Sequence, residues 1–406
     1  MPTTHLLDCN EDVLWLILGY LSQGDLRNAD LREALSFVER TQLPYRDIWA
    51  AELRAGTIDA HLAVLLSQLP RLQDLRLSNK FYQKCDLVAL VLRSMLCDSH
   101  SGQPIPGFSS TSLHQLHTVD LERYPGLRLA PETRNTECIL PLFYLPSIKD
   151  MSISMPDPPE PEFPWPTSQP PSALGLRTLR LHHIREAHLG QVLAAAPRLH
   201  TLHWNWRYDP DTEDQFNTPT VNLDLLLPAL LPLRDTLTTL DIFAFSLFSP
   251  RPYIPFPLHV QGSMHPLSTF PHLTTLTIPL VFFTGFPLPI PHTTTTTGLS
   301  HSLPPNLEAL TLTDDLYADI DTEEPWDVTG HVLAVRAWLA AGAGADVRAR
   351  TPRLRSVVLV LRGEDDEVCE EERAAREEIR GLARGAGIGL DIRRDEEAGV
   401  GMVWRG

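Results

Sequence analysis

Histidine and cysteine are the side chains in this sequence that could bind a metal ion or act as nucleophiles. The 16 histidines include no His-Glu-x-x-His motif, and no carboxylate near His182, His183 or His188 has metal-ligand spacing. The five cysteines form no Cys-x-x-Cys pair, which argues against a zinc site and a disulfide framework. The sequence also lacks a Gly-x-Ser-x-Gly elbow and a phosphate-binding glycine loop. We therefore predict no catalytic residue, no bound metal and no cofactor.

One apolar pattern recurs along most of the chain and predicts the elements that position its polar residues. Apolar residues stand at the first, fourth and sixth positions of the pattern, so the last two point to one face of a short strand. The nine copies are Leu72-Leu75-Leu77, Leu116-Val119-Leu121, Ile148-Met151-Ile153, Leu176-Leu179-Leu181, Leu199-Leu202-Trp204, Leu237-Leu240-Ile242, Leu273-Leu276-Ile278, Leu307-Leu310-Leu312 and Leu354-Val357-Leu359.

Prolines are phased against this pattern. Six copies carry a proline two residues before the first apolar position, namely Pro70, Pro146, Pro197, Pro271, Pro305 and Pro352. A random leucine-rich sequence would contain apolar triplets, but it would not align prolines with them. Because proline ends a preceding helix and favours extended structure, we expect each of these prolines to lead the chain into a strand.

Strands of this kind cannot bury their apolar faces singly, but parallel strands stacked side by side can. Parallel strands need crossover connections, which are usually helices. The segments between and after the triplets contain five candidate helices, at residues 86–97, 186–196, 221–231, 328–341 and 370–384. The sequence therefore predicts a repeated cycle of strand, loop and helix.

This cycle resembles the leucine-rich repeat over residues 58–395, although most repeats exceed that family's ~20–29 residues. The resemblance implies an α/β leucine-rich-repeat solenoid of parallel strands with returning helices. The proline-rich insertions near 156–171 and 250–297 are expected to be extended loops, and the acidic cluster 314–327 a solvated surface. The alternative is an ordinary α/β domain with leucine-rich strands.

The first fifty residues lack the triplet pattern and show apolar residues at helical spacing instead. Asp12 precedes an apolar stripe at helical spacing, and Asp25 can cap a second helix. Residues 11–26 resemble the opening of an F-box, with Cys9-Asn10 in place of the usual Leu-Pro. The resemblance implies that residues 1–50 form an F-box-like helical segment. By this resemblance a Skp-type adaptor, and through it a cullin, would bind Val13, Leu14, Ile17, Leu18, Leu21, Asp25 and Leu26. The alternative is a helical cap on the first repeat, which such an array needs.

If the triplets are parallel strands, the residues between their apolar positions form one continuous surface, and a repeat array uses such a surface to bind another macromolecule. Arginine and aromatic residues dominate interface energetics, so Arg180 and His203, beside Trp204 and Trp206, are our first candidates for its centre. The full set of candidate contacts with a client protein is Arg76, Asp120, Arg180, His182, His203, Asn205, Trp206 and Asp241.

Charge and hydropathy exclude other classes of partner. The net charge of −17 argues against non-specific nucleic-acid binding, which requires basic charge. The apolar run at residues 13–21 is too short for a bilayer, and acidic residues before it disfavour a signal peptide. We expect a cytoplasmic or nuclear, non-enzymatic substrate adaptor of a Skp–cullin–F-box ubiquitin ligase that holds a protein client. The alternative is a leucine-rich-repeat interaction scaffold with a helical cap and no ligase link.

Overall fold

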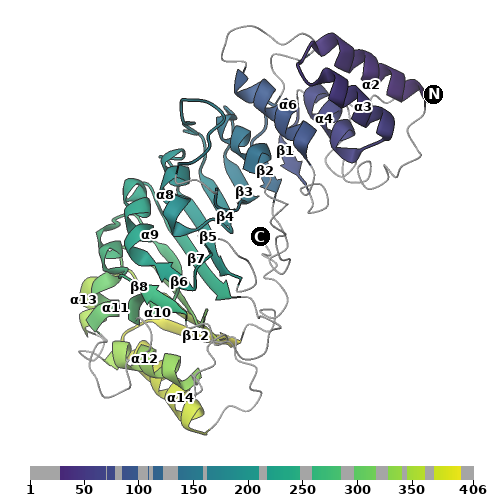
Figure 1. Cartoon of the computed structure of the whole chain (residues 1–406). Helices are drawn as coiled ribbons and strands as arrows, with labels where there is room; N and C mark the ends of the chain where they lie inside the picture. The colour runs from purple at the N-terminus through teal and green to yellow at the C-terminus, as the bar shows by residue number, and fades with distance from the viewer. Residues whose placement is uncertain are drawn as a thin grey trace, which may run out of the picture. The chain divides into compact units, whose positions relative to one another are not determined.

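The structure, a computed structural model, describes residues 28–69, 71–77, 85–98, 108, 113–121, 136–158, 162–209, 217–246, 258–284, 297–316, 328–340, 345–361 and 370–394. It is an α/β structure with a ten-stranded parallel sheet and returning helices (Figure 1). The chain divides into two compact units, residues 1–123 with 129–176 and residues 124–128 with 177–406.

Strands form at all nine predicted positions. In sheet order the ten strands are β1 (Asp74–Arg76), β2 (Thr118–Leu121), β3 (Asp150–Ser154), β4 (Thr178–His182), β5 (Thr201–Tyr208), β7 (Thr239–Ser246), β9 (Thr275–Pro279), β10 (Ala309–Thr313), β11 (Ser356–Leu361) and β12 (Gly389–Arg394). Two further strands, β6 (Thr220–Asn222) and β8 (His259–Gln261), form a separate parallel pair.

The register of the strands places equivalent apolar residues side by side. In the second unit, the middle apolar residues of the triplets lie side by side in one row. This row is made of Leu179, Leu202, Leu240, Leu276, Leu310 and Val357. Every member of this row is buried. Burial of one such side chain stabilises the fold by about 1.5–3 kcal/mol, so a one-residue slip that exposed the row would be costly.

A repeated backbone contact sets this register at the start of each strand. The carbonyl of His200 accepts the N–H groups of Thr238 and Thr239 at 2.8 and 3.0 Å, and the carbonyl of Thr238 accepts those of Thr274 and Thr275 at 2.9 and 3.1 Å. The carbonyls of Gln73, His117, Arg177, Thr274 and Glu308 make the same double contact with the next repeat. Each repeat is thus held to its neighbour by equivalent bonds, as expected of a stacked array.

Three of the phased prolines, Pro197, Pro305 and Pro352, lead the chain into its strand through a turn. The N–H of Leu199 donates to the carbonyl of Ala196 at 3.2 Å, and Pro197 lies at the second position of that turn. The turns that contain Pro305 and Pro352 have the same form. Proline suits this position because its ring already holds the φ angle that the turn requires.

The first unit contains α2 (Asn28–Thr41), α3 (Arg46–Ala55), α4 (Ile58–Gln68), α6 (Asp86–Leu96), α7 (Thr136–Ile139) and the 3₁₀ helix η4 (Leu140–Tyr144). The second unit contains α8 (Glu186–Ala194), α9 (Leu223–Leu230), α10 (Val281–Thr284), α11 (Thr297–Ser302), α12 (Val328–Ala340), α13 (Ala345–Arg350), α14 (Glu370–Gly385) and the 3₁₀ helices η5 (Leu231–Leu233) and η6 (His265–Thr269). All five predicted helices are present, although α9 is preceded by β6 where helix was expected. Figure 1 shows α8 and α9 side by side on one face of the sheet.

The two proline-rich insertions differ. Residues 162–171 form no helix or strand, as predicted, and are anchored where Trp165 packs edge-on against Phe143 with ring centroids 5.5 Å apart. The described part of 250–297 contains β8, η6 and α10 in addition to the predicted strand β9, so the expectation of extended loops is wrong for these three elements. β8 and α10 lie between prolines, and η6 carries a proline in its first turn, where proline is tolerated.

Helices α2, α3 and α4 form a head that packs on the first returning helix. Trp49 of α3 is fully buried, donates from Nε1 to the carbonyl of Ala60 at 3.0 Å and meets Phe37 of α2 edge-on. Asp59 of α4 accepts the backbone N–H groups of Leu87 and Val88, at 2.8 and 3.0 Å, at the N-terminus of α6. The carboxylate therefore caps α6 and ties the head to the first repeat.

Candidate protein-binding face

Five of the eight predicted client-binding residues lie together on strands β4, β5 and β7. Arg180, His203 and Asp241 are register partners and form one row across the three strands. His182 and Asn205 form the next row. Because residues two apart on a strand point to the same face, these five side chains share the face opposite the buried leucine row. We call them the polar cluster.

Within the first row of the polar cluster, His203 and Asp241 form a pair. Nδ1 of His203 lies 2.8 Å from Oδ2 of Asp241, and both side chains are mostly buried. The carboxylate orients the imidazole, and the contact becomes an ion pair when the ring is protonated. This pair therefore holds two functional groups in fixed positions on adjacent strands.

The second row of the polar cluster is more deeply buried. The amide Nδ2 of Asn205 lies 2.7 Å from Nδ1 of His182, and an amide nitrogen can only donate. Nδ1 of His182 is therefore the acceptor, which leaves the proton of the neutral ring on Nε2. Burial lowers the pKa of His182 from its ordinary 6.5 to about 4, with smaller contributions from the charges of His203 and Arg180. His182 is neutral at pH 7.

Arg180 is the cation of the polar cluster. Its side chain is half-buried, and it makes no hydrogen bond or ion pair with any residue that the structure describes. The amide Oδ1 of Asn205, in the neighbouring row, is buried and likewise has no hydrogen-bond partner among the described residues. The cluster thus offers a bound peptide one half-buried arginine donor, whereas the amide oxygen of Asn205 is enclosed within the protein.

Arg76 and Asp120 belong to the first unit. They are register partners on β1 and β2, where Arg76 is exposed and Asp120 is half-buried. They share a face with each other in the way the sequence predicted. Since they lie in a separate compact unit, we describe them apart from the polar cluster.

Trp206 is not on this surface, which corrects its place among the candidate contacts. Its side chain is fully buried, and the guanidinium of Arg185 stacks over its ring at 4.4 Å from the centroid. The alternation of Leu202, Trp204 and Trp206 along β5 places all three on the core face. That alternation was the available sequence signal, and it continues beyond the predicted triplet because β5 runs for eight residues.

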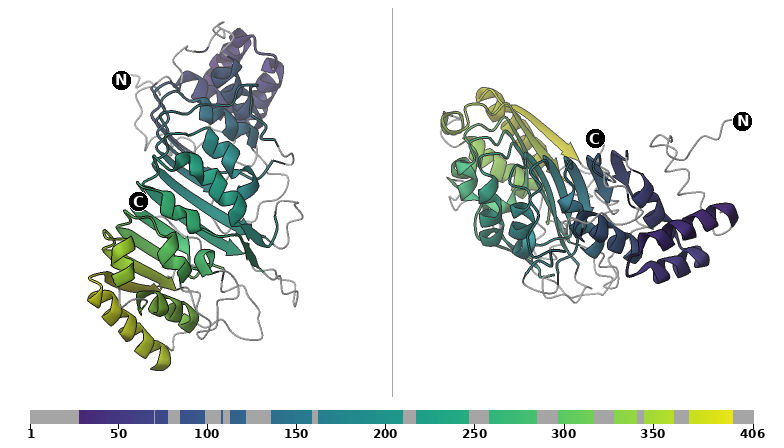
Figure 2. Two further views of the ribbon diagram at one scale, coloured as in Figure 1. Left: turned by 90° about the vertical axis from the view of Figure 1, so that its left-hand side faces the viewer. Right: turned by 90° about the horizontal axis from the view of Figure 1, so that it is seen from above.

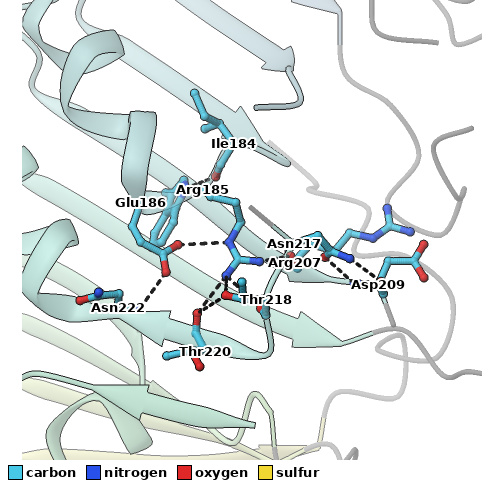
Figure 3. Close-up of polar contacts among 10 residues, drawn as sticks. Ile184, Arg185, Glu186, Arg207, Asp209, Asn217, Thr218, Thr220 and Asn222 are labelled. Atoms are coloured by element: carbon cyan, nitrogen blue, oxygen red, sulfur yellow. Dashed lines mark hydrogen bonds and ion pairs between the residues drawn. The ribbon is translucent and has the colours of Figure 1, made fainter. Parts of the chain in front are cut away.

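Arg185 organises the region beneath Trp206 (Figure 3). Its guanidinium donates from Nε to Oε2 of Glu186 at 3.2 Å, and from NH2 to the carbonyls of Thr218 and Thr220 at 3.1 and 2.9 Å. Oε1 of Glu186 accepts the N–H of Asn222 at 2.7 Å. The buried charges are thus paired and hydrogen-bonded, as a buried ion pair requires. Their effect is to fix residues 218–222 against the N-terminus of α8.

The turn that carries Arg185 explains how it reaches this position. His183 adopts a φ of 71°, in the left-handed region, between β4 and α8. Its Nε2 lies 2.7 Å from NH1 of Arg207, which can only donate. Neither the positive φ of His183 nor its contact with Arg207 has a signal in the local sequence.

A buried acidic residue was also missed. Asp315, in the cluster expected to be a solvated surface, is buried and accepts the N–H of Ala244 through Oδ2 at 2.7 Å. Asp314 beside it is buried as well. An acidic run shows only composition, so no local signal distinguished these two residues from their neighbours.

The predicted adaptor contacts Val13, Leu14, Ile17, Leu18, Leu21, Asp25 and Leu26 lie outside the described residues. Among the residues that the structure describes, no group of three or more His, Cys, Asp or Glu side chains is arranged to hold a metal ion. In the same part of the chain, no helix is both long and apolar enough to cross a membrane. Comparisons with protein-family models and with curated proteins found no match to the chain.

Proposed function

We propose that this chain is a substrate-recognition adaptor of a Skp–cullin–F-box ubiquitin ligase, built as an F-box-like segment followed by a leucine-rich-repeat solenoid. The polar cluster on β4, β5 and β7 is the observation that carries the client-binding half. It presents Arg180, a half-buried arginine that makes no hydrogen bond or ion pair with any described residue. A client protein that supplied an anionic group would pair with this guanidinium.

The adaptor-binding half rests on the sequence of residues 11–26 and on the head that follows it. Trp49 joins α3 to α4. Asp59 joins α4 to α6, and Tyr45, just before α3, donates its hydroxyl to Oγ of Ser94 in α6 at 3.1 Å. The head that these contacts hold together follows residues 11–26 in the chain and begins with α2. The apolar stripe then contacts the Skp-type adaptor without contributing to the core of the head.

The contacts between the head and α6 also favour a second candidate function. A capped leucine-rich-repeat scaffold needs a helical element whose apolar side covers the first repeat. Helices α2 to α4 already provide such a cap through Phe37, Trp49 and Leu53, which are buried. In this second function, residues 11–26 extend the cap and bind no ligase component.

Binding of a purified Skp-type adaptor to the full chain separates the two functions. We expect a one-to-one complex that Ile17→Asp with Leu21→Asp abolishes. Ile48→Asp is the matched control, since Ile48 is 60% exposed on α3 and lies outside the F-box-like stripe. Unchanged adaptor binding by the double variant would contradict the proposal.

Stability gives the second readout, and the structure decides where to cut the chain. Deletion of residues 1–40 would remove Phe37 and Val38, which are buried, so it would destabilise the head under either function. A deletion that ends at residue 27, before α2, is therefore the informative one. The adaptor proposal expects an unchanged free energy of unfolding, whereas an extended cap expects a loss.

A further inference from the structure

β12 is the last strand at its end of the sheet (Figure 2). Within the described residues it pairs with β11 and with no other strand. No strand in the described part of the chain pairs with its second edge, whose backbone N–H and C=O groups can pair with a further strand. Such an edge is a template for association unless something occupies or blocks it.

The apolar side of β12 is incompletely covered. Leu390 and Ile392 continue the rows of Val357 and Leu359, their register partners on β11. Val357 and Leu359 are at most 1% exposed, whereas Leu390 and Ile392 are only half-buried. The two apolar rows thus end on β12, where no described strand covers their last residues. Further apolar contact with Leu390 and Ile392 would therefore be stabilising.

The other side of β12 carries two opposite charges. Asp391 and Arg393 have side chains that are 54% and 65% exposed, and they contact each other along the strand at 2.6 Å. They flank Ile392 symmetrically. A charged edge strand normally discourages association because identical charges meet. Here the two charges differ in sign, so an antiparallel pair of two β12 strands can bring opposite charges together.

We propose that β12 is an interface between two copies of this chain, which pair antiparallel about Ile392. In an antiparallel pair centred on residue 392, residue 391 of one copy lies opposite residue 393 of the other on the same face. Asp391 therefore meets Arg393 of the second copy twice, once on each side of the axis. Ile392 meets its own equivalent on the apolar side.

This arrangement selects a second copy over other occupants. A twofold axis makes the contact self-complementary, so the assembly closes as a dimer. Parallel pairing of the two open β12 edges would turn one sheet over, so that the charged face of one copy would adjoin the apolar face of the other and the two charge pairs would not form. The six residues of β12 form a contact at the lower end of the size range of specific interfaces, so the dimer dissociates on dilution.

Sedimentation equilibrium of the full chain tests the proposal through a charge swap. We expect a monomer–dimer equilibrium at about 1–100 µM, in the range of small interfaces. Arg393→Asp places like charges opposite each other twice and should raise the dissociation constant at least about tenfold. Asp391→Arg combined with Arg393→Asp restores opposite pairs and should return it to within about threefold of the original.

Three results would overturn the proposal: a chain that stays monomeric throughout that range, a dimer that Arg393→Asp leaves unchanged, or a swap variant that fails to recover. Circular dichroism of each variant shows that the fold is retained, which is expected because both side chains are more than half exposed. Ile392→Arg gives an independent check, since it places two cations at the axis and should also abolish the dimer. If it leaves the dimer intact, the interface is not β12.

Discussion

Replacing Arg185 with methionine tests whether the buried ion pair with Glu186 holds the segment after β5 in place. The guanidinium donates to Glu186 and to the carbonyls of Thr218 and Thr220, and the side chains of Arg185 and Glu186 are 5% and 4% exposed. Methionine keeps the length of the side chain but leaves the Glu186 carboxylate without its cation. Breaking a buried pair in this way costs about 3–5 kcal/mol.

A double variant separates the charge from the packing. Arg185→Met with Glu186→Gln removes the uncompensated carboxylate, while glutamine retains an oxygen for the N–H of Asn222. The free energy of unfolding should then fall by only about 1–2 kcal/mol, the value of the remaining lost hydrogen bonds. Urea denaturation followed by circular dichroism gives both numbers from the midpoint and the slope.

The control for Arg185 is Arg234→Met, which removes an ion pair with Asp235 whose side chains are 50% and 73% exposed. An exposed pair of this kind contributes less than about 0.5 kcal/mol. The reasoning is refuted if Arg185→Met costs no more than this control. It is also refuted if the double variant is as unstable as the single one, since the buried charge would then not be the cause.

Four further predictions follow from the described contacts. Asp59→Ala should lower the free energy of unfolding by about 1–2 kcal/mol and speed hydrogen exchange at Leu87 and Val88, because α6 loses its cap; Asp59→Asn, which keeps an acceptor, should cost less. His182 has a folded pKa of about 4, below its ordinary 6.5, so the stability it contributes is present above pH 6.5 and is lost as the pH falls towards 4. His182→Gln should flatten that part of a stability–pH curve. Leu276→Ala, at a fully buried position, should cost about 2–5 kcal/mol by urea denaturation. Arg180→Gln should leave stability within about 0.5 kcal/mol, because the side chain has no described partner to lose.

The strands could be predicted because their signal is local. The apolar positions of each triplet show which side chains of its strand face the core, because successive side chains on a pleated strand point to opposite faces. Five returning helices were found in the same way from their apolar spacing. By contrast α3 and α4 were not foreseen, since their apolar residues pack against one another and against α6 without a regular repeat.

The polar cluster was predicted in part. Strand parity alone brought Arg180, His203 and Asp241 to one face. It could not show that His203 and Asp241 pair or that Asn205 is buried, because these depend on neighbouring strands. Trp206 was misplaced for a different reason: its aromatic character was given more weight than its position in the alternation of β5. Asp315 was missed because its partner, Ala244, lies far away in the sequence.

The central claim is that one chain links a client, bound at the polar cluster, to a ligase, bound through residues 13–26. A photo-crosslinking amino acid at position 180 identifies proteins that contact the cluster in cells, with the same amino acid at exposed Leu225 on α9 as the background control. The half-life of a protein that crosslinks only at position 180 is then measured beside the original chain and beside the variant with Ile17→Asp and Leu21→Asp. The account expects a longer half-life with the variant, and an unchanged half-life would contradict it.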